Sequence, residues 1–324
     1  MPRPGWPSLV ADRDLDLLVL ADVNPDLVVS DTAMEVAFGQ TETLVDDAEL
    51  TIGGSGAIMA CGAARLGLRT ALAGLVGADQ FGEFMVRAVS ERGVDVTGVG
   101  VDPGVRTGLT VVLARPQDRA ILTFPGAIAA MTAERVDAGL LARARHVHVA
   151  SFFLQDGLVS GLAQLLASAR AAGATTSVDP NWDPAQRWDG GLHDLLGDID
   201  ILLPNGAEAC ALAGVADAEA AAAKLAADGP LVAVKLGACG AVAVPAGGGE
   251  LVRATPPERV VDPVDAVGAG DAFDGGLLCA LLNGQPLAEA LAFACACGTL
   301  SMRAAGGTAA QPTLAEARAV TRRP

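Results

Sequence analysis

Two glycines stand just before a carboxylate in the segment 264–273 (VDAVGAGDAF). Gly268 and Gly270 precede Asp271, and an apolar, helix-like run follows. The first N–H groups of a helix lack intrahelical partners and carry partial positive charge, so this helix start could bind an anion. An aspartate beside an anion site is suited to take a proton from a hydroxyl that attacks a phosphate. The alternative is an ordinary acidic residue in the first turn of a helix.

The chain lacks two common sequence motifs for binding nucleotide phosphates. Lys224 and Lys235 are its only lysines, and neither follows a glycine in the GxxxxGKS or GxxxxGKT pattern of a P-loop. No GxGxxG sequence occurs, so a hydride-transfer enzyme with a dinucleotide-binding motif loses its main support. The helix start at 268–271 and a second glycine cluster at 51–67 therefore remain as candidate sites.

The composition is typical of a globular cytoplasmic protein. Its 324 residues are 51% apolar, which is enough to bury a large core. No segment approaches the roughly 18 apolar residues of a membrane span, and the N-terminus lacks a secretory apolar region. The net charge of -16 would repel nucleic acid and anionic lipid, so we expect neither as a partner. The six cysteines show no paired CxxC spacing, which favours free buried thiols over zinc ligands.

Apolar runs of strand length alternate with longer helix-like segments. This pattern predicts an α/β fold in which helices cover a parallel sheet. The clearest strand candidates are 15–22, 146–153, 175–179, 200–205 and 231–237. The clearest helix candidates are 56–67, 80–93, 156–173, 218–229 and 286–306, and each ends near a glycine, as left-handed helix caps prefer.

Two further segments alternate polar and apolar residues, which indicates half-exposed strands of a small antiparallel sheet. They are about 24–52 and 105–125, and a helical stretch separates them. We expect them to form a lid over the open end of the parallel sheet, inserted in a single domain that spans 1–324. The free edges of such a lid could pair with a second copy, so a homodimer through the lid is an option.

The sequence resembles the ribokinase-like (PfkB) carbohydrate kinases in a series of segments that occur in the family's order. The segment 53–67 (GGSGAIMACGAARLG) resembles the first family signature, and 265–273 (DAVGAGDAF) resembles the second, written DTxGAGD. The other matching segments are ADVNPDLVV, VGADQFGEFMVRAVSERGVD, VDPNW, LLPNGAEA and VKLGACGA. The resemblance covers residue 22 to about 313. It implies a ribokinase-like three-layer α/β/α domain with a mostly parallel central sheet and a small antiparallel β lid.

The resemblance also implies ATP-dependent phosphorylation of a hydroxymethyl group. Asp271 matches the family's general base, which removes the proton from the acceptor hydroxyl. Gly268, Ala269 and Gly270 match the family's anion hole, whose backbone N–H groups stabilise charge on the transferring phosphoryl group. Only small residues let the backbone come that close, which accounts for the glycines.

Further residues match positions around the nucleotide and its ions. Asn205 and Glu208 match the family's NxxE motif near Mg2+, where Glu208 acts through water, although the same pair could form a capping box. Asp265 matches a loop that holds K+ in some members, but Ala266 replaces the usual threonine, so this ion stays an open alternative. The residues that match positions near ATP are Asn181, Lys235, Gly237, Gly240, Cys295 and Gly307.

The expected acceptor site lies near the first signature. Asp26 matches the aspartate that holds two sugar hydroxyls in the family, and Asn24 lies on the same face of the strand. Gly53 and Gly54 match the diglycine that lets the sugar approach the backbone. These residues would bind a polyol.

Two departures from the family pattern bear on the acceptor. Ile58 replaces the asparagine of the GGxxxN motif, and Phe153 lies where a polar contact is expected. Apolar contacts at both positions would favour a substrate with an apolar or aromatic part. The alternative is that both side chains pack in the core. His146 and His148 share one face of a strand and are expected to be structural.

We therefore expect a kinase that uses ATP and Mg2+ to phosphorylate a sugar or a sugar-like alcohol. A nucleoside is the second candidate acceptor. A sugar phosphate is a lesser option, because nothing in the spacing of Arg106, Arg119 and Arg303 requires a phosphate ligand. A non-catalytic ligand-binding relative is the remaining alternative, and the retention of Asp271 with its anion hole argues against it.

Overall fold

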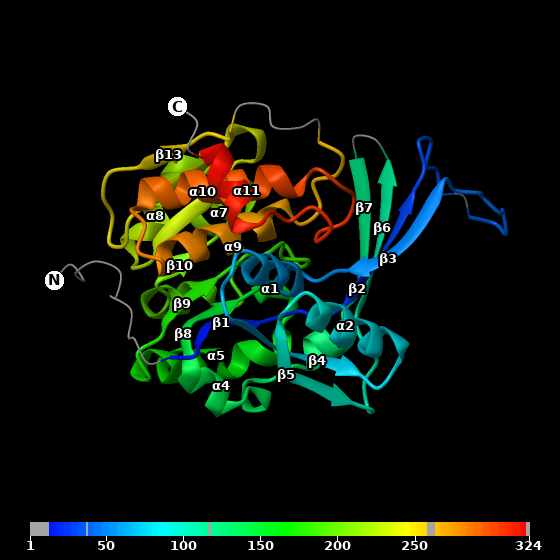
Figure 1. Ribbon diagram of the computed structural model, residues 1–324, viewed down its shortest axis with the longest axis horizontal. Coiled ribbons are helices and arrows are strands. Elements are labelled where there is room, and N and C mark those ends of the chain that lie inside the picture. The colour runs from blue at the N-terminus through cyan, green and yellow to red at the C-terminus, as the bar shows by residue number, and fades with distance from the viewer. Residues whose placement is uncertain (1–12, 37, 116–117, 258–262, 322–324) are drawn as a thin grey trace.

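A nine-stranded, mostly parallel sheet forms the centre of the protein (Figure 1). The computed structural model describes residues 13–36, 38–115, 118–257 and 263–321. The strands are, in spatial order, β13 (Val252–Ala254), β12 (Ala241–Val244), β11 (Leu231–Lys235), β10 (Ile201–Leu202), β9 (Thr175–Val178), β8 (Ala144–Val149), β1 (Leu15–Leu20), β4 (Thr70–Gly77) and β5 (Asp95–Asp102). Only β12 runs antiparallel to its two neighbours. The inner strands are buried on both faces, which is why β1, β4 and β11 are mostly apolar in the sequence.

Helices cover both faces of this sheet, and each face has its own apolar core. One core packs the sheet against α1 (Ser55–Arg65), α2 (Gln80–Glu91), α9 (Ala269–Leu282), α10 (Leu287–Ser301) and α11 (Leu314–Thr321). The other core packs it against α4 (Ala138–Arg143), α5 (Asp156–Ala171), α6 (Leu192–Leu195), α7 (Gly206–Ala213) and α8 (Ala218–Ala227). A short helix, α3 (Ala127–Ala130), contacts β4. The result is the expected three-layer α/β/α architecture.

A separate four-stranded sheet projects from one side of this body (Figure 1). Its strands are, in order, β3 (Asp47–Ile52), β2 (Pro25–Ser30), β6 (Leu109–Arg115) and β7 (Asp118–Phe124). The pairs β2–β3 and β6–β7 are antiparallel, as predicted, whereas β2 and β6 pair in parallel. The parallel pairing arises because two hairpins distant in sequence meet side by side. Residues 116–117, inside the predicted lid segment, lie outside the described residues.

The predicted strands and helices are present, but three of them end clearly earlier than expected. The strand predicted at 146–153 ends at Val149, before a 3-10 turn at Phe152–Leu154, and the strand predicted at 200–205 covers only Ile201–Leu202. The segment 286–306 stays helical only to Ser301, where α10 ends. Beyond it, Gly306 N–H donates to the Asp265 carboxylate at 3.0 Å, which turns the chain back toward the start of α9. Within the part of the chain that the structure describes, no helix combines the length and the apolar character that a membrane crossing would need.

Candidate active site

The first turn of α9 has the geometry expected for an anion site. Gly268 is its N-cap and adopts the left-handed conformation, with φ of 73°. A Cβ at Gly268 would lie 2.6 Å from Gly307 Cα, so glycine is required for both conformation and space. Ala269 N–H donates to Ala266 O at 3.3 Å. Among the described residues, the N–H groups of Gly268, Gly270 and Asp271 have no hydrogen-bond acceptor, and they are the donors available to an anion.

Asp271 lies in this first turn, and its carboxylate meets the start of a second helix. Ser55, the first residue of α1, donates its hydroxyl hydrogen bond to Asp271 Oδ1. Burial raises the pKa of Asp271 to about 7, against the opposing effect of the Ser55 hydrogen bond. Asp179 and Asp22 raise it further, whereas Lys235 lowers it. A carboxyl with a pKa near 7 is a suitable general base at neutral pH.

Asp22 fixes the start of α1 from the end of β1. Its buried carboxylate accepts hydrogen bonds from Ser55 N–H at 3.0 Å, Gly56 N–H at 2.8 Å and the Ser151 hydroxyl at 2.9 Å. Asn181 Nδ2 in turn donates to Ser151 Oγ at 3.0 Å. This network joins the ends of β1, β8 and β9 to the start of α1, and thereby to Asp271.

Lys235, at the end of β11, is held between two buried carboxylates. Its Nζ lies 2.9 Å from Asp179 Oδ2 and 2.9 Å from Asp274 Oδ2. Burial disfavours the charged ammonium, but the facing carboxylates of Asp179, Asp274 and Glu208 outweigh this effect and raise the pKa of Lys235. The structure therefore places Lys235 in an ion-paired cluster at the end of β11, and its position near ATP stays a prediction.

Asn205 and Glu208 form a capping box at the start of α7. Asn205 Oδ1 accepts from Glu208 N–H at 2.9 Å, and Glu208 Oε2 accepts from Asn205 N–H at 2.7 Å. Glu208 Oε1 also accepts from Asn205 Nδ2 at 2.5 Å. Burial, together with the charge of Asp179, raises the pKa of Glu208 to about 7. The capping box that the sequence allowed is confirmed. A role of Glu208 near Mg2+ through water stays a prediction.

The residues expected at the acceptor site come together at the base of the small sheet. Asp26 on β2 is buried, and a Cβ on Gly53 would lie only 1.9 Å from its Oδ1. A Cβ on Gly54 would lie 3.0 Å from Asn24 Oδ1. Asn24 Nδ2 donates to Thr110 Oγ1 on β6 at 3.1 Å. Burial and the charge of Asp22 raise the pKa of Asp26 to about 7.

Ile58 packs beneath the start of α9. It is 3% exposed, and Cβ atoms added at Gly268 and Gly307 would lie within 3.0 Å of its side chain. Ile58 is therefore a core residue that supports the two glycine segments, which is the alternative interpretation of the sequence. The expectation that it contacts substrate is corrected, because Gly268 and Gly307 cover its side chain.

Three other residues expected near the nucleotide lie on the β11–β12 connection and on α10. Gly237 and Gly240 both have positive φ and flank a 3-10 turn. A Cβ on Gly240 would lie 2.1 Å from Ala254 O, so this glycine lets two strands approach closely. Cys295 is buried in α10, with its Sγ 3.9 Å from the same carbonyl oxygen.

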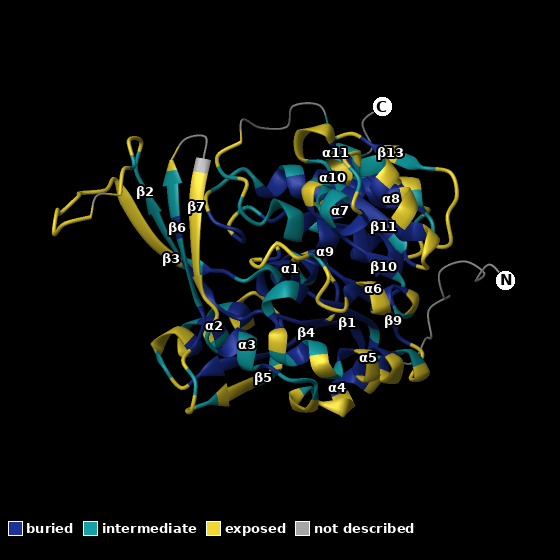
Figure 2. Ribbon diagram, turned by 180° about the vertical axis from the view of Figure 1, so that it is seen from behind, coloured by how far each residue is buried: buried dark blue, intermediate teal, exposed yellow. Residues whose placement is uncertain are grey.

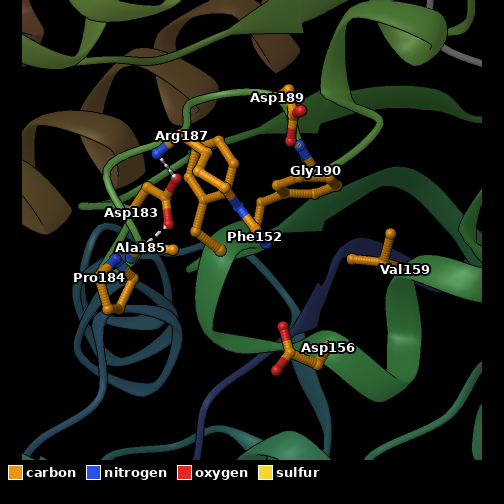
Figure 3. Close-up of a pocket in the computed structure, with 10 residues that line it drawn as sticks. Phe152, Asp156, Val159, Asp183, Pro184, Ala185, Arg187, Asp189 and Gly190 are labelled. Carbon is orange, nitrogen blue, oxygen red and sulfur yellow. Dashed lines mark hydrogen bonds between the residues drawn. The ribbon is translucent and has the colours of Figure 1, made fainter.

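Phe153 belongs to an aromatic cluster and lines a pocket of about 350 Å³ (Figure 3). Its ring packs edge-on against Phe152 and Trp188, at centroid distances of 5.1 and 5.6 Å. Figure 3 shows the Asp183 carboxylate directed at the backbone of the surrounding loop, to which it is hydrogen-bonded. The residues that line this pocket do not include Asp26, and a contact of Phe153 with the acceptor stays a prediction.

Asp265 and the two histidines have structural partners. Asp265 accepts from Val267 N–H at 2.9 Å and from Gly306 N–H at 3.0 Å. His146 and His148 are buried, and both contact Ser177 Oγ at 2.7 Å. Burial lowers the pKa of both imidazoles, so they are neutral at physiological pH. As predicted, the histidines stabilise the sheet.

Sequence reasoning missed four residues of the site: Ser55, Ser151 and Asp274 contact the predicted residues Asp271, Asn181 and Lys235, and Asp22 fixes Ser55 and Ser151. The sequence did contain a signal for Asp22 and Ser55. Asp22 lies two residues before Asn24, hence on the same side of an extended segment, and Ser55 directly follows the diglycine. The contact of Asp274 with Lys235 has no local signal, because 39 residues separate them.

Comparisons with known proteins place this geometry in a family. The family model described as pfkB family carbohydrate kinase matches residues 15–314. Fructokinase-1 of Oryza sativa subsp. japonica is 31% identical, with 90% of this chain and 96% of the relative covered. Ribokinase of Haemophilus influenzae is 28% identical, with 93% and 96% covered.

Solved structures agree with the family match. An E. coli protein assigned as a Ribokinase II, in complex with ATP and Mg2+, superposes with a TM-score of 0.82 at 25% identity, covering 96% of this chain and all of that one. Arabidopsis thaliana ribokinase, complexed with ribose and ATP, shares the fold with a TM-score of 0.82 at 24% identity, with 96% and 99% covered. The chain belongs to the pfkB family of carbohydrate kinases.

Proposed function

We propose that this carbohydrate kinase transfers the γ-phosphate of ATP to a hydroxymethyl group of a sugar or sugar-like substrate, with Asp271 as the general base. The observation that carries the proposal is the position of Asp271 in the first turn of α9, three residues after the left-handed Gly268. The carboxylate and the N–H donors of Gly268 and Gly270 thus belong to one helix start. That arrangement serves a reaction in which a proton leaves the attacking hydroxyl while negative charge moves onto phosphate oxygens.

In the proposed reaction, the acceptor oxygen attacks the γ-phosphorus, the bond to the β-phosphate oxygen breaks, and ADP leaves. Asp271 takes the proton of the acceptor hydroxyl. The N–H groups at the start of α9 stabilise the transferring phosphoryl group without rearranging, because the helix already fixes them. The left-handed Gly268 allows the phosphate to come close to the backbone.

The residues near this centre fit a magnesium ion held largely through water. Among the described residues, no group of three or more carboxylate, histidine or cysteine side chains is arranged to bind a metal directly. Mg2+ usually keeps several waters and binds nucleotide phosphates, so a direct protein cage is not needed. Glu208, with Asp179 nearby, would hold those waters, and the ion would neutralise charge on the phosphates. Asp265 would hold a monovalent cation if one is used.

The acceptor site is proposed to be formed by Asn24, Asp26, Gly53 and Gly54. Asp26 is the only one of these that can be an anion, and an ionised carboxylate can accept two sugar hydroxyls. The lack of any side chain at Gly53 leaves the space in which Asp26 lies. Relatives named fructokinase and ribokinase make a sugar the preferred acceptor class. A nucleoside is the second candidate, favoured by a solved adenosine kinase of Sinorhizobium meliloti that shares the fold, with a TM-score of 0.79.

The small sheet is proposed to act as the lid of this site and as a dimer contact. Its strands β3 and β7 are mostly exposed (Figure 2). Ile121, Leu122 and Phe124 on the edge strand β7 expose 42–59% of their surface. Apolar residues on a free edge strand favour pairing with a second copy. Sedimentation velocity would test this, since a monomer at micromolar concentration would contradict it.

A panel assay tests the proposed activity. The protein is incubated with Mg-ATP and, separately, with D-fructose, D-ribose, a sugar acid, fructose 6-phosphate or adenosine, and ADP formation is followed. We expect turnover with at least one unphosphorylated sugar or sugar acid. Turnover of adenosine alone would favour the nucleoside alternative. Binding of ATP without turnover of any compound would favour the non-catalytic alternative.

A further inference from the structure

Ser55 is the only residue among the described ones whose side chain donates a hydrogen bond to Asp271. Ser55 follows Gly53 and Gly54, and these two glycines leave space for Asp26 and Asn24. Its hydroxyl instead points from the first turn of α1 to Asp271 Oδ1 in the first turn of α9. Two helix starts are therefore joined through this hydroxyl.

The position of Ser55 is itself fixed by a buried acceptor. Asp22 is 3% exposed and accepts the N–H groups of both Ser55 and Gly56. The Ser151 hydroxyl adds a third hydrogen bond to the same carboxylate. A buried carboxylate with three donors holds its partners in one arrangement, because each lost hydrogen bond would leave buried charge unpaired. The hydroxyl of Ser55 is thus presented to Asp271 from a rigid support.

We propose that Ser55 is a positioning residue for the general base: it holds the Asp271 carboxylate in place through Oδ1 and leaves Oδ2 to receive the proton of the acceptor. This inference rests on the proposed function, because it assumes that Asp271 is the base. A hydroxyl that donates to a carboxylate stabilises the ionised form, which is the form that can accept a proton.

The charges around Asp271 explain why such a donor is needed. Asp179 from the end of β9 and Asp22 from the end of β1 both disfavour ionisation of Asp271, as does burial. Lys235 from the end of β11 favours it, but its ammonium is shared between Asp179 and Asp274. The Ser55 hydroxyl from α1 has the largest effect in favour of the ionised base.

The first test compares Ser55→Ala with Ser55→Thr, which keeps the hydroxyl. The acceptor is D-fructose or D-ribose, whichever is turned over, and kcat/KM is measured from pH 5 to pH 9. We expect the acid limb of the Ser55→Ala profile to move up by about one pH unit, because one hydrogen bond to the charged form is lost. The rate should fall about tenfold at pH 6 and much less at pH 9, with the KM for ATP unchanged. Ser55→Thr should restore the wild-type profile.

Ser160→Ala is the matched control, since Ser160 lies on the exposed part of α5 and its hydroxyl bonds only Gly157 O. This control should leave the profile unchanged. An acid limb that stays in place in Ser55→Ala, whatever happens to the rate, overturns the proposal. Wild-type activity in Asp271→Asn would instead contradict the role of Asp271 as general base. The two variants thus distinguish failure of the proposed function from failure of the proposed role of Ser55.

A second test needs no substrate. Asp271 has a folded-state pKa of about 7 against 3.8 for an ordinary aspartate, so it contributes stability that is lost as pH rises toward 7. Ser55→Ala should raise the pKa of Asp271 in the folded state further, so that the loss of stability continues above pH 7. Urea unfolding at pH 6, 7 and 8 measures it. This loss above pH 7 should be absent when Ser55→Ala is combined with Asp271→Asn. An equal loss in the double variant would show that Ser55 does not act through Asp271 and would overturn the proposal.

Discussion

Lys235 Nζ lies 2.9 Å from Asp274 Oδ2, one helical turn after the proposed base Asp271. This ion pair joins the end of β11 to the first turns of α9, and the second pair of Lys235, with Asp179, adds the end of β9. Asp274 is 1% exposed, and its Oδ1 has no hydrogen-bond partner among the residues that the structure describes. Burial raises the pKa of Asp274 well above its ordinary value. Lys235 is therefore the positive charge that faces both buried carboxyl groups and favours the ionised form of each.

Removing this charge should destabilise the protein. Lys235→Met leaves Asp179 and Asp274 buried without a counter-charge, and loss of one partner of a buried ion pair costs about 3–5 kcal/mol. The cost should be smaller at pH 5 than at pH 8, because protonation neutralises the orphaned carboxylates. Urea unfolding at the two pH values measures this. The matched control is Lys224→Met at the chain's other lysine, which is exposed and bonds only Ala213 O. Equal losses in both variants would contradict the assignment.

Lys235 also shows how far sequence reasoning extends into the site. The position of Asp271 after Gly268 and Gly270 is local, so the motif predicts the helix start. The partners of Lys235 are not local, because Asp179 and Asp274 come to it through sheet order and helix packing. The sequence therefore predicts a position near ATP for Lys235 but not its two carboxylate partners.

The strands and helices of the fold were largely predictable, because local sequence patterns decide them as they decide the helix start at 268–271. Buried strands such as 15–20 and 231–235 are mostly apolar runs, and helices such as α1, α5 and α8 end shortly before a glycine. The parallel pairing of β2 with β6 was not predictable, because it depends on where two distant hairpins meet. Ile58 was ambiguous, since an apolar residue in a substrate motif has the same sequence signal whether it faces a ligand or the core.

Asp26 should make stability depend on pH in a defined direction. Its pKa is raised to about 7 in the folded state, so the folded protein holds a proton between pH 4 and 7 that the unfolded chain has lost. Stability from this group is complete below pH 4 and declines as pH rises to 7. Asp26→Asn lacks this decline. Its free energy of unfolding should match that of the wild type at pH 4 and exceed that of the wild type by roughly 2–4 kcal/mol at pH 8. Chemical denaturation at both pH values checks the sign, and a variant that is less stable at pH 8 would contradict it.

The same variant should lose its acceptor. Asparagine keeps the shape of Asp26 but cannot accept two hydroxyl hydrogen bonds with a charged carboxylate, so acceptor KM should rise by about 10- to 100-fold. The KM for ATP should change little, because Asp26 lies on β2 at the base of the small sheet. Steady-state kinetics with each substrate varied in turn separates the two effects. A rise confined to the KM for ATP would place Asp26 outside the acceptor site.

Gly53 should not tolerate a side chain. A Cβ there would lie 1.9 Å from Asp26 Oδ1 and 2.7 Å from Asp26 N, so Gly53→Ala must displace the β2 backbone or the carboxylate. We expect a loss of stability of about 1–3 kcal/mol and a larger loss of kcat/KM for the acceptor. Gly197→Ala is the control, since a Cβ at Gly197 meets open space and its φ is not positive. Thermal unfolding and acceptor kinetics are compared for both, and a wild-type Gly53→Ala enzyme would refute the contact.

Asp271→Asn should separate chemistry from binding. The amide oxygen of asparagine can still accept the Ser55 hydroxyl, so the local geometry is kept while the basicity is lost. Loss of a general base lowers the chemical step by about two to four orders of magnitude. ATP affinity, measured by isothermal titration calorimetry with Mg-ATP, should stay near the wild-type value, because the N–H donors of α9 belong to the backbone. Asp228→Asn, an exposed aspartate at the end of α8, serves as the control and should remain fully active. If Asp271→Asn instead keeps its rate, another group must remove the proton, and the anion site would then be the only part of the proposed mechanism that α9 supplies.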